Sequence, residues 1–214
     1  MGVKGLWKSN MVTLALLIFL NLFAFSFGTT AWIIIGLLLL AGAMYFSFRQ
    51  GMGIGREACA ILKTVNHAMD PESAQHESLD KKYISQTWSV ARGVKSIFAS
   101  ALIPYVAGCV YIICTLLKVE PMILPSRVIA WVLALPYWPI ITYWYQEFTR
   151  LEPAIVAILM ISPFVLPLCT FAGYLQGPKL WKKTEEAMAQ GKRRAKAKSR
   201  IVKKKQPKVQ KPQI

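Results

Sequence analysis

Few residues in this chain have the type and spacing that chemistry requires. The four cysteines, Cys59, Cys109, Cys114 and Cys169, form no CxxC pair, and no cysteine and histidine cluster exists. Cys109 and Cys114 are five residues apart, roughly 140° around a helix, so they do not share a face. Thiolate and imidazole metal sites need such ligands close together. The sequence therefore predicts no metal site and no cofactor.

Two other patterns resemble parts of known sites, and each lacks an essential component. The glycines of Gly51–Gly55 suggest a phosphate-binding loop, but Arg56 stands where a dinucleotide fingerprint needs glycine, and no Gly-Lys-Ser/Thr follows. We interpret them as a flexible joint. Glu147, Arg150 and Glu152 lie together without a histidine, nucleophile or metal ligand set, so we interpret that segment as a solvated turn. The sequence predicts no enzyme.

The strongest charge pattern is the basic tail, residues 175–214. It holds fourteen of the chain's 26 Lys and Arg residues against Glu185 and Glu186, which makes it twelve of the sixteen net positive charges. Such a run repels itself and cannot bury apolar surface, so its natural partners are anionic. The residues expected to bind lipid or RNA are Lys179, Lys182, Lys183, Lys192, Arg193, Arg194, Lys196, Lys198, Arg200, Lys203, Lys204 and Lys205.

The tail divides by distance from the apolar region that precedes it. Gly177-Pro178 is expected to end one helix and to start another, since proline fits a first turn. Lys179–Lys183 are expected to bind anionic lipid headgroups, and the later cations reach further, toward lipid or structured rRNA. Beyond about Gln206 the composition predicts disorder. The tryptophans expected at a membrane interface are Trp88, Trp144 and Trp181.

Long uncharged runs predict that most of the chain lies in a bilayer. Met11–Phe48 contains no charged residue, and as one helix it would be about 57 Å long, too long for a single crossing. A break at Gly28-Thr29-Thr30 would make it a helical hairpin. Five hydrophobic segments result: Met11–Phe27, Thr30–Phe48, Ile97–Leu117, Val128–Tyr145 and Ala154–Tyr174.

These segments predict an all-α fold, a polytopic helical membrane protein, because helices satisfy their own backbone groups in lipid. None of the five contains Asp, Glu, Lys, Arg or His, which disfavours proton relays and voltage sensing. Their polar residues are expected to join helices by hydrogen bonds; they are Asn21, Ser26, Ser100, Thr115, Ser162 and Thr170. Prolines in the last three segments permit an alternative, in which freed carbonyls line a transport site.

A polar stretch, residues 49–96, separates the second and third segments. Within it Arg56–Met69 has apolar residues at helical spacing, and Asp70-Pro71 should stop that helix. We expect an amphipathic helix, either in the headgroup plane or docked on the bundle or on a partner protein. The predicted organisation is residues 1–10, the hairpin 11–48, the polar loop 49–96, the segments 97–174 and the tail 175–214.

The number of crossings is left open by two rules that conflict. Hydropathy favours five crossings, and five is the preferred expectation over four. The excess of basic residues on the cytoplasmic side favours four, because a re-entrant or interfacial fourth segment puts all but Lys118, Arg127 and Arg150 on one side with the tail. Pro136 and Pro139 would suit such a segment. In either case we expect the C-terminus to be cytoplasmic and the membrane to be the plasma membrane.

The order of parts resembles that of the membrane-protein insertases of the YidC class, some of which have five spans and a basic, ribosome-binding tail. The intramembrane arginine of those insertases has no counterpart here. The expected function is that of a non-enzymatic membrane protein in scaffolding or assembly, with lipid, rRNA or another membrane protein as partner. A small transporter or transport-complex subunit is the alternative.

Overall fold

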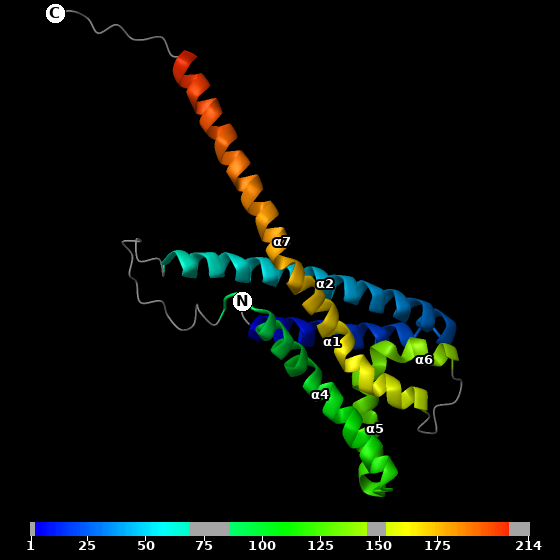
Figure 1. Cartoon of the computed structure of the whole chain (residues 1–214). Helices are drawn as coiled ribbons and strands as arrows, with labels where there is room; N and C mark the ends of the chain where they lie inside the picture. Colours follow the sequence, from blue (N-terminus) through cyan, green and yellow to red (C-terminus); the bar gives the residue numbers. More distant parts are fainter. Residues whose placement is uncertain (1–2, 69–85, 145–152, 206–214) are drawn as a thin grey trace, which may run out of the picture.

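The computed structural model describes residues 3–68, 86–144 and 153–205, and within these ranges every regular element is a helix (Figure 1). The predicted all-α fold is confirmed. In chain order the elements are α1 Val3–Phe25, α2 Thr29–Ala68, α4 Val90–Leu116, α5 Glu120–Ala134, the 3₁₀ turn η1 Leu135–Tyr137, α6 Trp138–Trp144 and α7 Pro153–Lys205.

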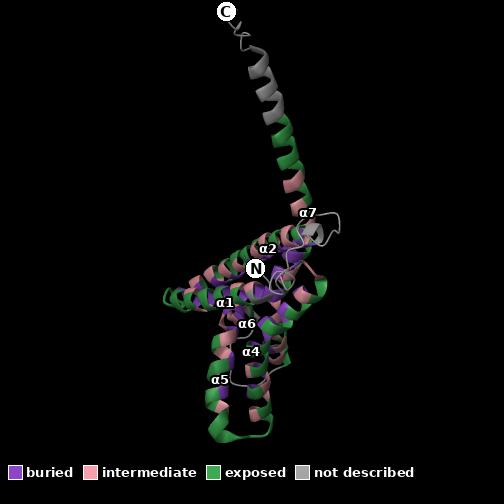
Figure 2. Cartoon of the chain, turned by 90° about the vertical axis from the view of Figure 1, so that its left-hand side faces the viewer, coloured by how far each residue is buried: buried purple, intermediate pink, exposed green. Residues whose placement is uncertain are grey.

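Five stretches of the described residues are long and apolar enough to cross a membrane. They are Gly5–Phe25, Thr29–Val65, Val90–Leu116, Glu120–Ile140 and Ile155–Arg194. Exposed positions occur along all of these helices (Figure 2). Many of them are large apolar residues, among them Phe19, which is 67% exposed, and Leu116, which is 72% exposed. A soluble monomer rarely exposes so much contiguous apolar surface. The distribution fits a multi-pass membrane protein whose outer faces contact lipid.

The predicted hairpin at Gly28 is present. Gly28 has φ +92°, in the left-handed region that favours glycine, and its carbonyl accepts a hydrogen bond from Trp32 N–H at 2.9 Å. α1 and α2 therefore run antiparallel. Leu17 of α1 and Leu40 of α2 are both buried in one apolar cluster midway along the pair.

α2 does not break where a joint was expected. It continues through Gly51, Gly53 and Gly55 as one 40-residue helix to Ala68, so the flexible-joint interpretation is wrong. The reason is tertiary: Gly51 and Gly55 lie against the backbone of α7, which supports the helix at its weakest residues. The predicted amphipathic segment is thus the last part of α2, and its end at Met69 lies outside the described residues.

α7 also continues past its expected end. Gly177 and Pro178 lie inside a single helix that runs to Lys205, so the prediction of a helix end there is wrong. Pro178 lacks only the N–H that would pair with the Tyr174 carbonyl. The indole Nε1 of Trp88 lies 3.5 Å from that carbonyl oxygen and partly replaces the missing donor. Beyond the bundle α7 extends away from the other helices (Figure 1).

The fourth segment is broken rather than continuous. α5 ends at Ala134, η1 follows, and the short α6 begins at Trp138. Pro136 and Pro139, which flank this junction, are both buried. The break occurs where two prolines remove backbone donors within four residues.

Candidate functional site

One end of the bundle, which we call the Tyr174 end, gathers parts of four helices. Leu6 of α1, Ile54 and Ala58 of α2, and Tyr174 of α7 are buried in one cluster, against which Trp88 packs. The backbone just before α4 is held there too, because Trp88 N–H donates to the Ala58 carbonyl at 3.1 Å. The Trp88 and Tyr174 rings stack with centroids 6.1 Å apart.

Glycines bring α2 and α7 into backbone contact at this end. A Cβ added at Gly51 would lie 1.9 Å from the Thr170 carbonyl oxygen, and one at Gly55 would lie 2.5 Å from that of Tyr174. Later residues of α2 meet later residues of α7, and Lys63 forms an ion pair with Glu185 further along. The two helices are therefore parallel. Small residues four apart allow this close approach, a common arrangement in membrane proteins.

α4 runs antiparallel to α7. Near its start, Gly93 packs against the Phe171 ring, and towards its end Gly108 lies against the Leu159 carbonyl, where an added Cβ would be 3.3 Å from the oxygen. The turn from α4 to α5 therefore lies away from the Tyr174 end. The Gly28 turn also lies away from the Tyr174 end. The α1–α2 hairpin and the α4–α5 hairpin diverge from each other towards their two turns (Figures 1 and 2).

A buried hydrogen-bond network joins three helices one turn further into the bundle. Asn10 of α1 donates through Nδ2 to Ser100 Oγ of α4 at 3.1 Å, and its Oδ1 accepts from Thr170 Oγ1 of α7 at 2.6 Å. Ser100 Oγ donates in turn to the Ser96 carbonyl at 2.7 Å. All four side chains are at most 4% exposed.

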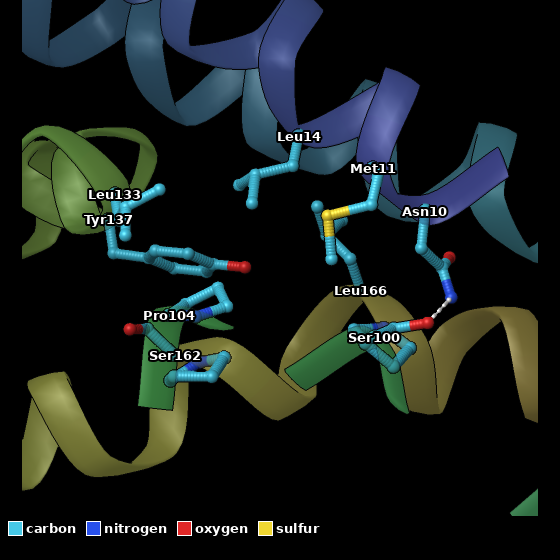
Figure 3. A pocket seen from close by; sticks show the side chains of 11 residues that line it. Asn10, Met11, Leu14, Ser100, Pro104, Leu133, Tyr137, Ser162 and Leu166 are labelled. Atoms are coloured by element: carbon cyan, nitrogen blue, oxygen red, sulfur yellow. Dashed lines mark hydrogen bonds between the residues drawn. The ribbon is translucent and has the colours of Figure 1, made fainter. Parts of the chain in front are cut away.

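A small cavity of about 20 Å³ lies between this network and η1 (Figure 3). Tyr137 approaches it from one side, with its hydroxyl directed inward, and Asn10 and Ser100 lie at the opposite side. Ser162 also lines it, and Met11, Leu14, Leu133 and Leu166 supply apolar walls. The volume is enough for about one water molecule, which needs roughly 10–15 Å³.

Prolines of α4 and α7 form part of the wall of this cavity. Pro104, Pro163 and Pro167 all line it. Each lacks the N–H that a helix would use, so the carbonyls four residues earlier lose their normal helical donor. One of these, the Leu159 carbonyl oxygen, lies against Gly108 of α4. The polar residues that line the cavity are Asn10, Ser100, Tyr137 and Ser162, with no carboxylate among the lining residues.

The tip of the broken segment reaches the middle of the bundle and then turns back. Tyr137 is buried in the cluster that contains Leu17, Leu40 and Leu166. Two residues later, Pro139 contacts α2 at Gly36, where an added Cβ would be 2.4 Å from the ring. Because Gly36 lies nearer than Leu40 to the Gly28 turn, α6 runs away from the Tyr174 end. α5 begins at the α4–α5 turn, which also lies away from the Tyr174 end.

The basic residues predicted as a binding site lie on one helix. Lys179, Lys182 and Lys183 are exposed on α7 close to the Tyr174 end, and Lys192, Arg193 and Arg194 are exposed further out. The backbone of α7 continues through Lys196, Lys198, Arg200, Lys203, Lys204 and Lys205, whose side chains lie outside the described residues.

Two of the three predicted interface tryptophans can be located. Trp88 is half-buried against Tyr174, and Trp181 is half-buried on α7 between Lys179 and Lys182. The side chain of Trp144, at the end of α6, lies outside the described residues, as do Glu147, Arg150 and Glu152.

The sequence pattern missed Asn10, which makes the only described side-chain hydrogen bonds that join α1 to α4 and α7. Asn10 precedes the first apolar run and so lies outside the five hydrophobic segments. Among the polar residues inside those segments, Ser100 and Thr170 do join helices, but Asn21 and Thr115 donate only to carbonyls of their own helices.

Among the described residues, no three His, Cys, Asp or Glu side chains lie close enough together to hold a metal ion. No family model, curated protein or solved structure matches this chain.

Proposed function

We propose that the chain crosses the plasma membrane four times, with both termini in the cytoplasm and with α5–η1–α6 as a re-entrant hairpin. Three packing relations support this arrangement: α2 is parallel to α7, α1 is antiparallel to α2, and α4 is antiparallel to α7. The start of α7 then lies on the same side as the end of α4. In the proposed arrangement the segment between them enters and leaves on that one side.

The distribution of charge supports the same arrangement. With four crossings, the proposed arrangement assigns both N-terminal lysines, the seven basic residues of 49–96 and the tail to the cytoplasm, and Lys118, Arg127 and Arg150 to the outside. This is the cytoplasmic excess that membrane insertion normally produces. Five crossings would place either the tail or the 49–96 stretch on the outside.

We further propose that the basic part of α7 binds a phosphate-rich polymer, with structured RNA such as rRNA as the ligand, and that the protein acts in scaffolding or assembly. The supporting observation is the single helix that carries the cations away from the bundle (Figure 1). Lys192 is eleven residues beyond Trp181, about 16 Å along the axis, and Lys205 is about 36 Å beyond it. Headgroup attraction fades within a Debye length of about 8 Å, so the outer cations are better placed for a soluble polyanion.

Ribosome co-sedimentation tests this proposal. The protein in phosphatidylcholine nanodiscs should pellet with purified ribosomes at low salt, and a chain ending at Gly191 should not. A chain that lacks only residues 206–214 keeps Lys192–Lys205 and should still pellet, which makes it the matched control. Pelleting by the chain that ends at Gly191 would contradict the proposal. Binding displaced by phosphatidylglycerol vesicles but not by RNA would assign the helix to lipid instead.

A second candidate function, a small transporter or transport-complex subunit, has its own support. The cavity beside Tyr137 is lined by polar groups and three prolines, next to a broken membrane segment. Broken helices of this kind form ion and substrate sites in transporters. Proteoliposomes should then show flux of a small cation or polar solute that Tyr137→Phe reduces. Absence of flux, together with no ligand-dependent thermal shift, would reject this candidate.

A further inference from the structure

A second hollow lies on the outside of the molecule, between α1 and α2. This α1–α2 groove has a volume of about 250 Å³ and is lined by Leu16 and Leu20 of α1 and by Leu38, Leu39 and Phe46 of α2. Leu16 and Leu38 are more than half exposed, so the groove opens outward rather than into the bundle. Thr13 is its one polar lining residue, and it donates to the Ser9 carbonyl of its own helix at 2.9 Å.

Gly42 also lines the groove, and no residue that the structure describes fills the space beside it. A Cβ added at Gly42 would meet nothing within 4 Å. By contrast, Gly51 and Gly55 on the same helix are in backbone contact with α7. A glycine inside a helix costs about 0.5–1 kcal/mol relative to alanine. At Gly42 no contact within the described residues offsets that cost.

Cations continue the line of the groove along α2. Arg49 follows Gly42 by seven residues and Arg56 follows Arg49 by seven more, and residues seven apart on a helix share a face with a drift of about 20°. Both arginines are exposed, and Gly53 between them is open. Arg49 lies about 10 Å along the axis from Gly42. The apolar groove therefore leads directly to two positive charges.

Within the part of the chain that the structure describes, neither arginine is paired with a carboxylate. The one salt bridge among the described residues joins Lys63 and Glu185, and neither Arg49 nor Arg56 takes part in it. The nearest carboxylate in sequence, Glu57, projects about 100° around the helix from Arg56. A phosphate that approached along the groove face would meet two arginine side chains that form no ion pair with any carboxylate of residues 3–68, 86–144 or 153–205.

We infer that the α1–α2 groove and Arg49 with Arg56 form a site for one anionic phospholipid. An acyl chain lies in the groove over Gly42, and the phosphate is held by the arginines. The volume is too small for a whole lipid or for a drug-sized ligand, which occupies 300–1,000 Å³, and it suits part of one chain. The site uses none of the tail residues, and so it does not depend on RNA binding by α7.

Native mass spectrometry of protein released from nanodiscs tests the site, with phosphatidylglycerol and phosphatidylcholine mixed in equal amounts. The wild-type protein should retain phosphatidylglycerol in preference. Arg49→Gln should reduce the retained fraction about five-fold, since one arginine near an anionic headgroup contributes about 1 kcal/mol. Gly42→Leu should reduce it at least as much, because the new side chain fills the groove without meeting the protein.

Matched controls separate the site from general lipid contact and from the tail. Ala41→Leu adds the same side chain one position away, on an exposed face, and should retain lipid like the wild type. A chain ending at Gly191 should also retain it. Unchanged retention in both Gly42→Leu and Arg49→Gln, or equal retention of the two lipids by the wild type, would overturn the inference.

Discussion

At the scale of single residues, most polar side chains inside this bundle satisfy themselves locally. The hydroxyls of Thr13 and Thr115 donate to carbonyls four residues earlier in their own helices. Asn10 is different, because its amide bonds both Ser100 and Thr170 on other helices. In lipid, such interhelical bonds are worth on the order of 0.6 kcal/mol each. Asn10 is therefore the residue whose loss should loosen the packing of α1.

Replacing Asn10 by leucine should lower stability by about 1 kcal/mol, since two interhelical bonds disappear while Ser100 and Thr170 keep acceptors in their own helices. The melting temperature in detergent should fall by about 2–4 °C. Thr13→Val removes a buried hydroxyl that bonds only within α1 and should have little effect. An equal loss in both variants would mean that the interhelical bonds are not the cause.

At the scale of elements, the contact between α2 and α7 organises the Tyr174 end. Four glycines lie at this contact, Gly51 and Gly55 of α2 and Gly173 and Gly177 of α7. At each of them, backbone atoms of the other helix occupy the space that a Cβ would need. This contact holds the polar end of α2 beside the basic helix. It also explains why neither helix breaks at its glycines.

Gly51→Ala should separate these helices, because its Cβ would lie 1.9 Å from a backbone oxygen of α7 that cannot move by itself. Gly53→Ala is the matched control, since its Cβ meets nothing within 4 Å, and it should be neutral or stabilising by up to about 1 kcal/mol. Disulfide formation between cysteines at Lys63 and Glu185, in a chain without other cysteines, reports the contact. Equal cross-linking in both variants would contradict the packing described.

At the scale of the whole molecule, the arrangement of helices bears on the number of crossings. α5 and α6 form a bent segment whose tip, at Tyr137, contacts the middle of α1, α2 and α7. If this segment enters and leaves the membrane on one side, it does not cross, and the chain crosses four times, through α1, α2, α4 and α7. The cavity beside Tyr137 would then be closed from the outer side by this tip.

Four crossings can be tested by labelling single cysteines from either side of the membrane. Cysteines at Val119 and Thr149, in a background without native cysteines, should both react with an impermeant reagent from outside. A cysteine at Ser199 should react only from the cytoplasmic side. Five crossings would instead put Val119 and Thr149 on opposite sides, so that result would exclude the re-entrant hairpin.

For the proposed RNA binding, the charge of α7 predicts a specific salt dependence. Replacing Lys192, Arg193 and Arg194 by glutamine should reduce the slope of log affinity against log salt by about 2, because each lost phosphate contact removes about 0.7–0.9. Lys118→Gln, on the opposite side of the proposed membrane, should leave the slope unchanged. Fluorescence titration of the protein in nanodiscs with rRNA at several salt concentrations measures it.

Some features could be predicted because they depend on short stretches of sequence. Uncharged runs long enough to cross a bilayer identified the helices, and Gly28 marked the hairpin that its positive φ now confirms. The basic residues were assigned to one C-terminal run by composition alone. Local signals failed at Gly55 and at Pro178, where breaks were expected and none occurs. Contacts from another helix overrode local propensity there.

The sequence by itself determined that this chain is helical, apolar along five stretches and strongly basic at one end, because these properties depend on residue type and period. Only the tertiary structure decided which helices are parallel, that Asn10 joins three of them, and that Tyr137 approaches the cavity between α1, α4 and α7. Those facts depend on contacts between residues up to 160 positions apart. No local pattern encodes such pairs, since they follow from how the glycine and proline sites let backbones approach or bend.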